Sequence, residues 1–466
     1  MRAPPRMIRA LGWCWLVMGS AAMVFLALAV ALGEAAAARG LGLTGVIGVF
    51  IGAVIVVSTR GADRPARAPA ALRLALLGWI TCPLLAAPSL APLAGGLQEG
   101  VFEAYSAMTT TGASLADPDT APRSLVLWRA ALQWLGGFAS LVLAVTVFAA
   151  LDQRGAGIRR STLLTVHDNN LFTNMGRTSR RLGGLYALLT LLGVVLLMVT
   201  GAELFDALCL AMSGISTGGM SPRGEPLAAW LPVPGILALA LICLIGAWNF
   251  ALIYEMITRR RLSRSASDLR AMLALCLMTG VVAGLAGGAA WTGPVSALEA
   301  LFAVTTSGFQ LGEGGPILPP AVLILLALLG GSAVSTAGGI KMPRVILLVR
   351  RAGEELSHLA HPSAAVFTRF AGRKASDEAL VSVWVYALAF PLALGIGTAV
   401  LGACGLDFET AWQVAGASLS NAGPLAQVDY AAMSGGAWIA ASAIMVLGRL
   451  EVLAAAAAIF VLLKGE

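Results

Sequence analysis

Charged residues are scarce in this 466-residue sequence: they make up 12% of the chain, whereas hydrophobic residues make up 58%. A soluble protein of this length carries far more charge on its surface, so the composition excludes that class. Apolar stretches of about 20 residues, long enough for a helix to cross a ~30 Å hydrocarbon layer, recur along the whole chain. The sequence therefore predicts a polytopic, all-α membrane protein without a large soluble domain.

Cysteine and histidine are also rare. The six cysteines lie singly, nearly all within apolar segments, at Cys14, Cys82, Cys209, Cys243, Cys276 and Cys404. Without a CxxC pair, they predict neither a disulfide framework nor a metal site. The three histidines, His167, His358 and His361, fall in predicted loops without the spacing of metal ligands. The spans contain no cluster of catalytic side chains, which argues against a membrane-embedded enzyme. The absence of a glycine-rich nucleotide loop predicts that any nucleotide is bound by another polypeptide.

Ten segments are predicted to span the membrane: residues 8–32, 40–59, 72–93, 124–151, 183–201, 232–257, 271–290, 317–350, 380–402 and 437–463. Most of the 31 Lys and Arg residues then lie on one side. The positive-inside rule predicts that this side, with the N-terminus, is cytoplasmic. Topology alone therefore accounts for the net charge of +7, and no nucleic-acid partner is expected.

Four shorter apolar stretches end in similar polar sequences. They are about ten to twelve residues long, too short to cross the membrane, and suit re-entrant helices. Each has a bulky apolar residue, then an acid, and later a hydroxyl or amide cluster with glycine. The four sequences are FEAYSAMTTTGAS (102–114), FDALCLAMSGISTGGMS (205–221), LEALFAVTTSGFQ (298–310) and FETAWQVAGASLSNAGP (408–424). They predict four degenerate repeats of a spanning helix, a short helix, a glycine turn and a second spanning helix.

Elementary electrostatics predicts what such a repeat does. A short helix that enters from outside and ends in mid-membrane points its partially negative C-terminus at the bilayer centre, where it stabilises a cation. The irregular backbone that follows leaves carbonyl groups for something else to satisfy, and a dehydrated ion does so. Gly112, Gly219, Gly308 and Gly423 would let four such segments crowd around one axis.

These repeats resemble the TrkH-type membrane subunits of the Trk/Ktr/HKT superfamily of potassium transporters. Besides the four short segments, the likeness rests on LWRAALQWLGG (127–137), ISTGGMS (215–221), GSAVSTAGGIKMPR (331–344), HPSAAV (361–366), SLSNAGP (418–424) and MVLGRLEVL (445–453), in the family's order along the chain. The resemblance implies four pseudo-symmetric helix–pore helix–helix repeats around a central pore, plus two N-terminal transmembrane helices. The implied units are residues 1–60 (the two-helix extension), 61–160, 161–262, 263–355 and 356–466.

The resemblance also implies a selectivity filter that binds K⁺. Its residues would be Thr110, Thr111, Gly112, Ser216, Thr217, Gly218, Gly219, Thr306, Ser307, Gly308, Ser420, Asn421, Ala422 and Gly423. Among these, K⁺ would contact Thr111, Gly112, Thr217, Gly219, Ser307, Gly308, Ala422 and Gly423. In Na⁺-conducting relatives serine often replaces the first-repeat glycine, so Gly112 favours K⁺. Whether Gly218 or Gly219 lines the narrowest ring stays open.

Two further features predict a gate. The apolar segment 317–350 is interrupted by Gly330, Gly331, Ser332, Ser335, Thr336, Gly338 and Gly339, just before Lys341. Such a run predicts a broken helix, and the resemblance implies an intramembrane gating loop at 330–341 beneath the filter. Arg449 lies within the last apolar run, where a charge usually faces a cavity or partner. The resemblance places it on the pore beside the loop, where it would repel cations.

The resemblance implies channel-like potassium uptake across the bacterial inner membrane, with K⁺ as the transported ion and no covalently bound cofactor. The alternative is a potassium symporter coupled to Na⁺ or H⁺, for which the spans offer no convincing carboxylate. The expected partners are a second copy in a homodimer, membrane lipid, and a cytosolic, TrkA-like nucleotide-binding regulatory subunit. The basic regions 154–181, 259–270 and 350–374 would provide that subunit's docking surface.

Overall fold

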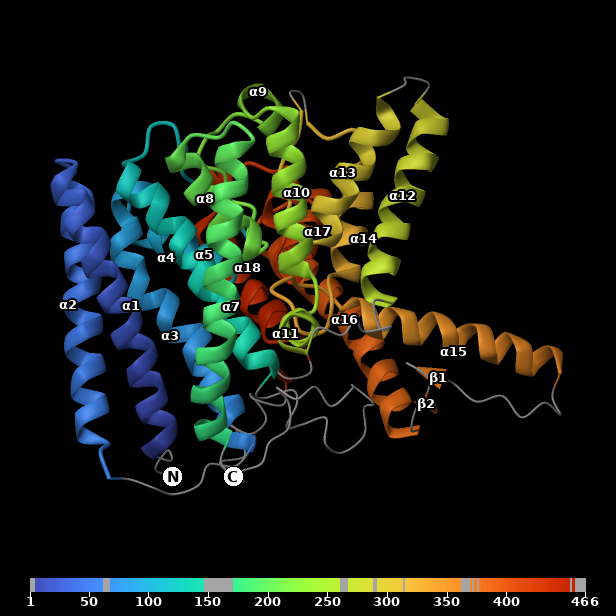
Figure 1. The fold of residues 1–466 in the computed structure, drawn as a ribbon, viewed down its shortest axis with the longest axis horizontal. Coiled ribbons are helices and arrows are strands. Elements are labelled where there is room, and N and C mark those ends of the chain that lie inside the picture. The colour runs from blue at the N-terminus through green and yellow to red at the C-terminus, as the bar shows by residue number, and fades with distance from the viewer. Residues whose placement is uncertain are drawn as a thin grey trace.

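The computed structural model describes residues 5–61, 68–145, 171–259, 267–287, 291–312, 315–361, 369–370, 373–374, 377–452 and 455–456. Figure 1 shows a bundle of helices. Their bounds are α1 (Pro5–Ala31), α2 (Ala35–Ser58), α3 (Ala68–Ala94), α4 (Leu97–Met108), α5 (Arg123–Leu143), α7 (Leu171–Val199), α8 (Leu204–Ile215), α9 (Leu227–Trp230), α10 (Val233–Ala247), α11 (Phe250–Arg259), α12 (Ser267–Gly287), α13 (Thr292–Val304), α14 (Pro320–Leu329), α15 (Met342–Ala360), α16 (Asp377–Ala403), α17 (Phe408–Ser420) and α18 (Gly435–Arg449). A two-stranded hairpin, β1 (Arg369–Phe370) and β2 (Arg373–Lys374), precedes α16.

Within the described residues, seven helices are long and apolar enough to cross a membrane: α1, α2, α3, α5, α7, α12 and α16. An eighth span is possible if α10 and α11, which meet at an angle of 95°, are counted together. Of the ten segments predicted to span, seven or eight are thus found among the described residues, and segment 317–350 is broken, as its Gly/Ser/Thr-rich run predicts. The expected span 317–350 consists of the ten-residue α14, an irregular stretch and α15, and α15 projects sideways from the bundle (Figure 1). α18 ends at Arg449, and most of the expected continuation to residue 463 lies outside the described residues.

The break between α10 and α11 was not expected from the sequence, which predicted one straight span over 232–257. It occurs at Trp248 and Asn249, and the released backbone groups bond to residues 332–336. The Ser332 amide donates to the Ala247 carbonyl at 2.9 Å, and the Phe250 amide donates to the Val334 carbonyl at 2.8 Å. An interrupted helix inside an apolar bundle is tolerated when a neighbouring segment supplies its missing partners, as here.

The N-terminal helices α1 and α2 pack closely against each other along one side of the bundle (Figure 1). Their contact runs along glycines: Gly19 lies against the Gly48 backbone, and Gly52 against Leu16. Small residues allow such close approach where helices lack a hydrophobic driving force between them. The turn between the two helices is joined to α5, because the Glu34 carboxylate accepts hydrogen bonds from the amides of Arg123 and Ser124 at 2.8 and 3.1 Å.

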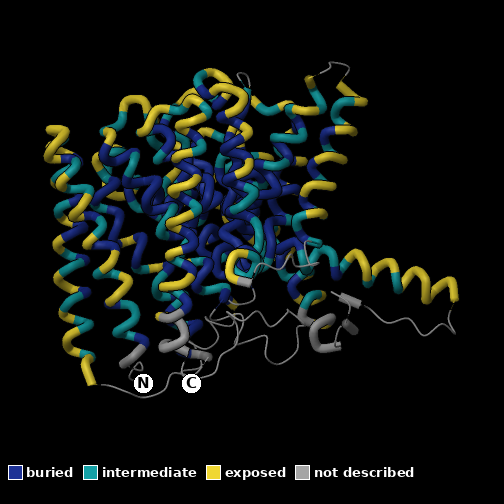
Figure 2. Tube along the Cα trace, viewed as in Figure 1, coloured by how far each residue is buried: buried dark blue, intermediate teal, exposed yellow. Residues whose placement is uncertain are grey.

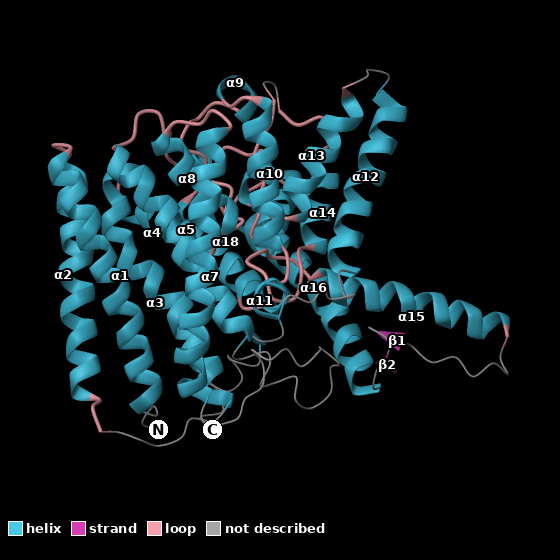
Figure 3. Ribbon diagram, viewed as in Figure 1, coloured by secondary structure: helices cyan, strands magenta, loops and turns pink. Residues whose placement is uncertain are grey.

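Burial is concentrated at the centre of the bundle. Figure 2 shows buried positions gathered in its middle, while the faces of outer helices such as α2 and α12 carry exposed residues. Those exposed residues include large apolar side chains such as Phe50 and Leu285, as a surrounding hydrocarbon layer allows. Figure 3 shows irregular segments inside the bundle, among the helices. These segments contain the residues singled out from the sequence.

Candidate functional site

The four short helices α4, α8, α13 and α17 all end in the same backbone turn. In each, the residue after the helical end has a left-handed conformation: Thr110 (φ 55°), Thr217 (φ 54°), Thr306 (φ 59°) and Asn421 (φ 55°). The next amide bonds to the carbonyl five residues back, as Thr111 does to Ser106 (2.9 Å), Gly218 to Ser213 (2.8 Å), Ser307 to Phe302 (3.0 Å) and Ala422 to Ala417 (2.8 Å). This pattern is the Schellman helix end. We call residues 110–112, 217–219, 306–308 and 421–423 turn segments one to four.

Threonine is an unusual choice for this position. A β-branched residue with positive φ is a conformational outlier, and the left-handed region costs an L-residue about 1–2 kcal/mol. The side chains explain why threonine or asparagine stands here instead of glycine, because each makes a contact below its turn. The Thr306 hydroxyl accepts from the Gly338 amide at 2.9 Å, and the Asn421 amide donates to the Met445 carbonyl at 3.0 Å. Strain of this kind concentrates at functional sites.

A second left-handed residue fixes the register of the segments. It is a glycine two positions later in segments one to three: Gly112 (φ 81°), Gly219 (φ 76°) and Gly308 (φ 67°). Gly219, and not Gly218, is therefore the counterpart of Gly112. The same register aligns Thr217 with Thr110, and Gly218 with Thr111. Segment four differs, since Gly423 begins a 3₁₀ turn (Gly423–Ala426) and has no positive φ.

The four segments contact one another in cyclic order. A Cβ added to Gly112 would clash with the carbonyl oxygen of Gly218, and one added to Gly219 would clash with that of Ser307. Gly308 lies against Pro424, the residue that follows segment four, and Gly112 and Gly219 also approach this proline. The circle closes where the Gly423 amide donates to the Thr111 carbonyl at 2.6 Å. Glycine is required in these segments because the backbones approach too closely for a side chain.

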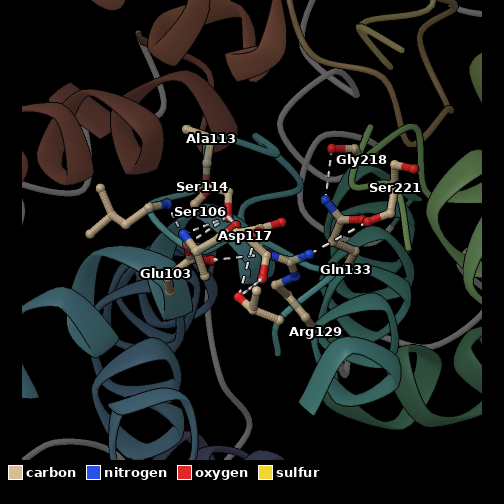
Figure 4. Close-up of polar contacts among 12 residues, drawn as sticks. Glu103, Ser106, Ala113, Ser114, Asp117, Arg129, Gln133, Gly218 and Ser221 are labelled. Carbon is tan, nitrogen blue, oxygen red and sulfur yellow. Dashed lines mark hydrogen bonds and ion pairs between the residues drawn. The ribbon is translucent and has the colours of Figure 1, made fainter. Parts of the chain in front are cut away.

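The repeated acid lies in the first turn of α8 and α17 but in the middle of α4 and α13, and in repeats one to three it holds the chain that leaves the turn segment. The buried Glu103 carboxylate accepts from the amide of Leu115 at 2.6 Å and from the Ser114 hydroxyl at 2.7 Å (Figure 4). Asp206 pairs with Arg223 at 2.6 Å, and Glu299 accepts from the amides of Ile317 and Leu318. In repeat four, Glu409 bonds instead to Gln413 on its own helix, at 3.3 Å. The repeated acid noticed in the sequence is thus, in three repeats, an anchor for the returning chain.

Arg129 on α5 completes the first of these anchors. Its guanidinium donates to the Ser114 hydroxyl at 2.8 Å and lies 4.0 Å from the Glu103 carboxylate (Figure 4). Both side chains are almost fully buried, with exposed fractions of 2% and 0%. A charge buried at this depth is retained only when it is paired. The sequence alone did not single out Arg129, because the partner residues are brought together only by the fold.

We expect Glu103→Gln to destabilise the protein by about 3–5 kcal/mol, because it leaves the buried Arg129 guanidinium without a compensating charge. Thermal or denaturant unfolding of the purified protein in detergent measures this effect. Glu99→Gln, one turn earlier on α4 and partly exposed, is the matched control and should cost less than about 1 kcal/mol. Equal stabilities for the two variants would contradict the anchoring role of Glu103.

Residues 330–341 form an irregular loop between α14 and α15, as the Gly/Ser/Thr-rich run predicts, and we call it the central loop. It packs directly under the turn segments. The Thr336 hydroxyl donates to the carbonyls of Ile215 and Gly246, each at 2.9 Å, and Gly338 has no room for a Cβ beside the Ser420 carbonyl. Within the loop, Gly330 and Gly339 have positive φ and face each other too closely for side chains.

The remaining predicted residues are placed as follows. Gly331 lies against the Ala247 carbonyl, the Ser335 hydroxyl donates to Ser332, and the buried Lys341 ammonium donates to Ala337. Ser216 is the C-cap of α8, and its hydroxyl bonds back to Met212. Ser420 is the last residue of α17. Every residue predicted for filter or gate lies within the described part of the chain.

Arg449 joins the turn segments to the central loop. Its guanidinium donates to the Thr336 carbonyl at 2.7 Å and to the Thr110 hydroxyl, and it is 7% exposed. Although α18 ends at Arg449 and does not continue as the sequence suggested, the side chain is buried. One arginine therefore contacts turn segment one and the loop derived from repeat three.

Glu451, two residues beyond Arg449, makes the second link to this region. A continuous helix would place Arg449 and Glu451 on different faces. The helix ends at Arg449, however, and Glu451 has φ 57°. Its carboxylate pairs at 2.6 Å with Arg344, in the first turn of α15. Arg344 also lies over the ring of Tyr386, 4.2 Å from its centroid. Four charged groups, Lys341, Arg344, Arg449 and Glu451, thus gather below the turn segments. Three of the four are positive.

Within the described residues, no group of three or more His, Cys, Asp and Glu side chains could hold a metal ion. The turn segments themselves offer backbone carbonyls, hydroxyls and the Asn421 amide, and they contain no carboxylate. Such groups suit a weakly held monovalent cation better than a tightly coordinated divalent metal.

Comparison with known proteins agrees with this architecture. Residues 78–281 match the TrkH family model, described as a cation transport protein. The chain is 31% identical over 399 residues to the Trk system potassium uptake protein TrkH of Halomonas elongata, covering 81% of both chains. The Salmonella typhimurium protein of the same name is 30% identical over 376 residues, covering 76% of this chain and 77% of that protein. The crystal structure of the potassium transporter TrkH from Vibrio parahaemolyticus superposes with a TM-score of 0.85 over 97% of both chains, at 24% identity.

The structural match confirms an all-helical polytopic membrane fold, and the sequence match identifies a transport protein and not an enzyme. The chain matches the two relatives over most of their length, and both are named potassium uptake proteins. This chain belongs to the TrkH family of cation transport proteins.

Proposed function

We propose that this protein mediates channel-like uptake of K⁺ through a filter formed by the four turn segments. The observation that carries the proposal is their cyclic contact, in which Gly112 and Gly219 each face a carbonyl oxygen of the next segment. Four short helices aim their C-terminal ends at this ring, so their partial negative charges favour a cation there. The Trk system relatives are named potassium uptake proteins, and the presence of Gly112 fits the same ion.

Backbone oxygens would replace the hydration shell of the ion. The proposed ligands are drawn from Thr111, Gly112, Thr217, Gly219, Ser307, Gly308, Ala422 and Gly423, and the register adds Gly218 as the counterpart of Thr111. The ring is not fourfold symmetric, because segment four turns into a 3₁₀ helix at Gly423. The membrane potential, worth ~2.3 kcal/mol per charge per 100 mV, would pull the ion inward.

The central loop and Arg449 are proposed to close the pathway below the filter. The loop bonds to repeat two through Thr336 and the break after α10, and to Thr306 of its own repeat through Gly338. Arg449 of repeat four donates to the Thr336 carbonyl. The Arg449 guanidinium adds a fixed positive charge against the loop. An entering K⁺ would meet this charge at short range in a medium of low dielectric constant, where repulsion is strong. Opening would require the loop and this arginine to separate.

The Arg344–Glu451 ion pair is proposed to hold the loop shut from its other end. We expect Arg344→Glu, tested without a regulatory subunit, to raise basal K⁺ uptake about five- to thirtyfold, because losing a charge-assisted bond shifts the closed state by about 1–2 kcal/mol. The reciprocal change Glu451→Arg should act in the same direction. The measurement is K⁺ uptake by cells, normalised to the amount of protein in the membrane.

The double variant Arg344→Glu with Glu451→Arg is the control, since it restores opposite charges in exchanged positions. It should return basal uptake towards the wild-type level. If the double variant is as active as either single variant, the pair has no role in closing the pathway.

The remaining proposals concern assembly and organisation. The repeat boundaries at 60, 160 and 262 each fall between two predicted spanning segments, whereas that at 355 lies within α15. The positive-inside pattern favours a cytoplasmic N-terminus in the bacterial inner membrane. A homodimer and a cytosolic nucleotide-binding subunit are proposed from the family resemblance. α15, whose basic residues include Arg350 and Arg351, extends from the end of the central loop. A cytosolic subunit that moved α15 would thereby act on the loop.

Growth of a K⁺-uptake-deficient bacterium on low K⁺ tests the proposed function. Expression of this chain with its partner subunit should restore growth at K⁺ concentrations that do not support the empty strain. Failure to restore growth, with the protein present in the membrane, would overturn the assignment to K⁺.

A further inference from the structure

Gln133 on α5 lies against turn segment two. Its side chain is fully buried, and its amide nitrogen donates to the Gly218 carbonyl at 2.7 Å (Figure 4). A Cβ built on Gly218 would overlap the amide of Gln133. The side chain of Gln133 therefore occupies the space that a side chain at position 218 would need.

The three atoms nearest to a Cβ at position 218 all belong to Gln133. The backbone of Gly218 is not left-handed, unlike that of Gly219, so an L-residue would adopt it without strain. The equivalent positions in the other segments carry side chains: Thr111, Ser307 and Ala422. Each of the two hydroxyls has a local partner, since Thr111 bonds to Thr109 at 2.7 Å and Ser307 to Thr305 at 3.0 Å, and Thr111 also accepts from the Asn421 amide at 3.1 Å. Segment two lacks such a pair of hydroxyls, and Gln133 on α5 supplies a hydrogen bond to its Gly218 carbonyl instead.

Glycines in the second spanning helices show why Gln133 reaches this position. Gly136 on α5, Gly246 on α10 and Gly448 on α18 each lie directly against a carbonyl in the last turn of their own repeat's short helix: Met108, Ile215 and Leu419 respectively. These three glycines are therefore equivalent. They let each long helix approach the end of a short one at backbone distance.

The residue three positions before each glycine is then also equivalent: Gln133, Cys243 and Met445. Gln133, from repeat one, bonds to Gly218 in turn segment two. The buried Cys243, from repeat two, occupies the equivalent position, and the next turn segment carries Ser307 in place of Gly218. In these two cases a long side chain goes with glycine and a short one with serine, whereas in the third case Met445 goes with Thr111 of segment one.

We propose that Gln133 is a positioning residue of the ion filter, which fixes the Gly218 peptide in place of the local hydroxyl pair used by segments one and three. The proposal rests on the proposed function, in which the turn segments bind the ion. It assigns a role to the LQWLGG motif: Gln133 holds the second segment, and Gly136 and Gly137 bring the helix close enough to do so, Gly137 against Ser216.

The test exchanges the two partners. Gln133→Cys removes the bond to Gly218, and Gly218→Ser drives a side chain into the Gln133 amide. Each single variant should lower the K⁺ over Na⁺ selectivity of uptake about tenfold, as expected for loss of about one buried hydrogen bond. The double variant carries the residue types that stand at the equivalent positions of the next repeat and segment, Cys243 and Ser307, and it should regain at least half of the lost selectivity on a logarithmic scale.

Rescue distinguishes positioning from simple destabilisation, because two independent losses of stability would add. Gln98→Cys, the same change at an exposed position on α4, should leave selectivity unchanged. A double variant no more selective than the single variants would overturn the proposal. Gly112→Ser distinguishes a failure of the filter assignment from a failure of the role of Gln133. If Gly112→Ser leaves selectivity unaltered, the filter assignment itself fails. If Gly112→Ser lowers selectivity but the double variant at 133 and 218 shows no rescue, only the role of Gln133 is rejected.

Discussion

Gly112→Ser is expected to reduce the K⁺ over Na⁺ selectivity of uptake at least tenfold. Gly112 has φ 81°, a conformation that costs serine about 1–2 kcal/mol. In addition, the new Cβ would collide with the carbonyl oxygen of Gly218. The segments can accommodate it only by moving that carbonyl, and a ring of oxygens shifted in this way no longer matches the size of a dehydrated K⁺. A tenfold loss corresponds to a change of about 1.4 kcal/mol in the difference between the binding free energies of the two ions.

The measurement is competition between Na⁺ and K⁺ for uptake in cells that contain equal amounts of each variant. Gly395→Ala on α16 is the matched control, since a Cβ there meets no atom within 4 Å and the backbone is helical. It should retain wild-type selectivity. A Gly112→Ser protein with unaltered discrimination would show that this segment does not select the ion.

The second large effect is expected at Arg449. Arg449→Gln should raise K⁺ uptake in the absence of a regulatory subunit tenfold or more. The variant removes the positive charge from the pathway and weakens the links to Thr336 and Thr110. Two unit charges 4 Å apart repel by about 4 kcal/mol at an effective dielectric constant of 20, so even a fraction of this barrier exceeds a factor of ten.

Arg449→Lys separates charge from geometry. Lysine keeps the positive charge but lacks the planar guanidinium that reaches two partners at once, so uptake should lie between the values for wild type and Arg449→Gln. Arg39→Gln, on α2 in the N-terminal helix pair, is the control for loss of an arginine and should behave as wild type. Unchanged or reduced uptake by Arg449→Gln at normal abundance would contradict the gating role.

Local features of the sequence predicted much of the site. The short helices and Gly112, Gly219 and Gly308 were found because each follows a repeated pattern within about a dozen residues. The structure gives all three glycines the left-handed conformation that the pattern suggests. The interruption of 317–350 was likewise visible as a run of weak helix formers. Ion binding and gating by these residues stay predictions.

Features that depend on contacts between distant segments were missed. The break after α10 was missed because a single glycine, Gly246, precedes it, and the groups that satisfy its backbone belong to the central loop some 80 residues later. Glu451 had been placed on the opposite face from Arg449 by assuming a continuous helix, whereas the helix ends between them. Gln133 belongs to LWRAALQWLGG, one of the stretches on which the family resemblance rests. Its role was missed because its partner Gly218 lies 85 residues away.

Ion flux into liposomes that contain only the purified protein tests the central claim most directly. With an inside-negative potential and the gate opened by Arg449→Gln, K⁺ should enter until it reaches the distribution set by the potential, while Na⁺ enters at least tenfold more slowly. Equal rates for the two ions would contradict a K⁺-selective filter. Accumulation of K⁺ beyond the level set by the potential, dependent on a Na⁺ or H⁺ gradient, would show coupled transport in place of the channel-like pathway.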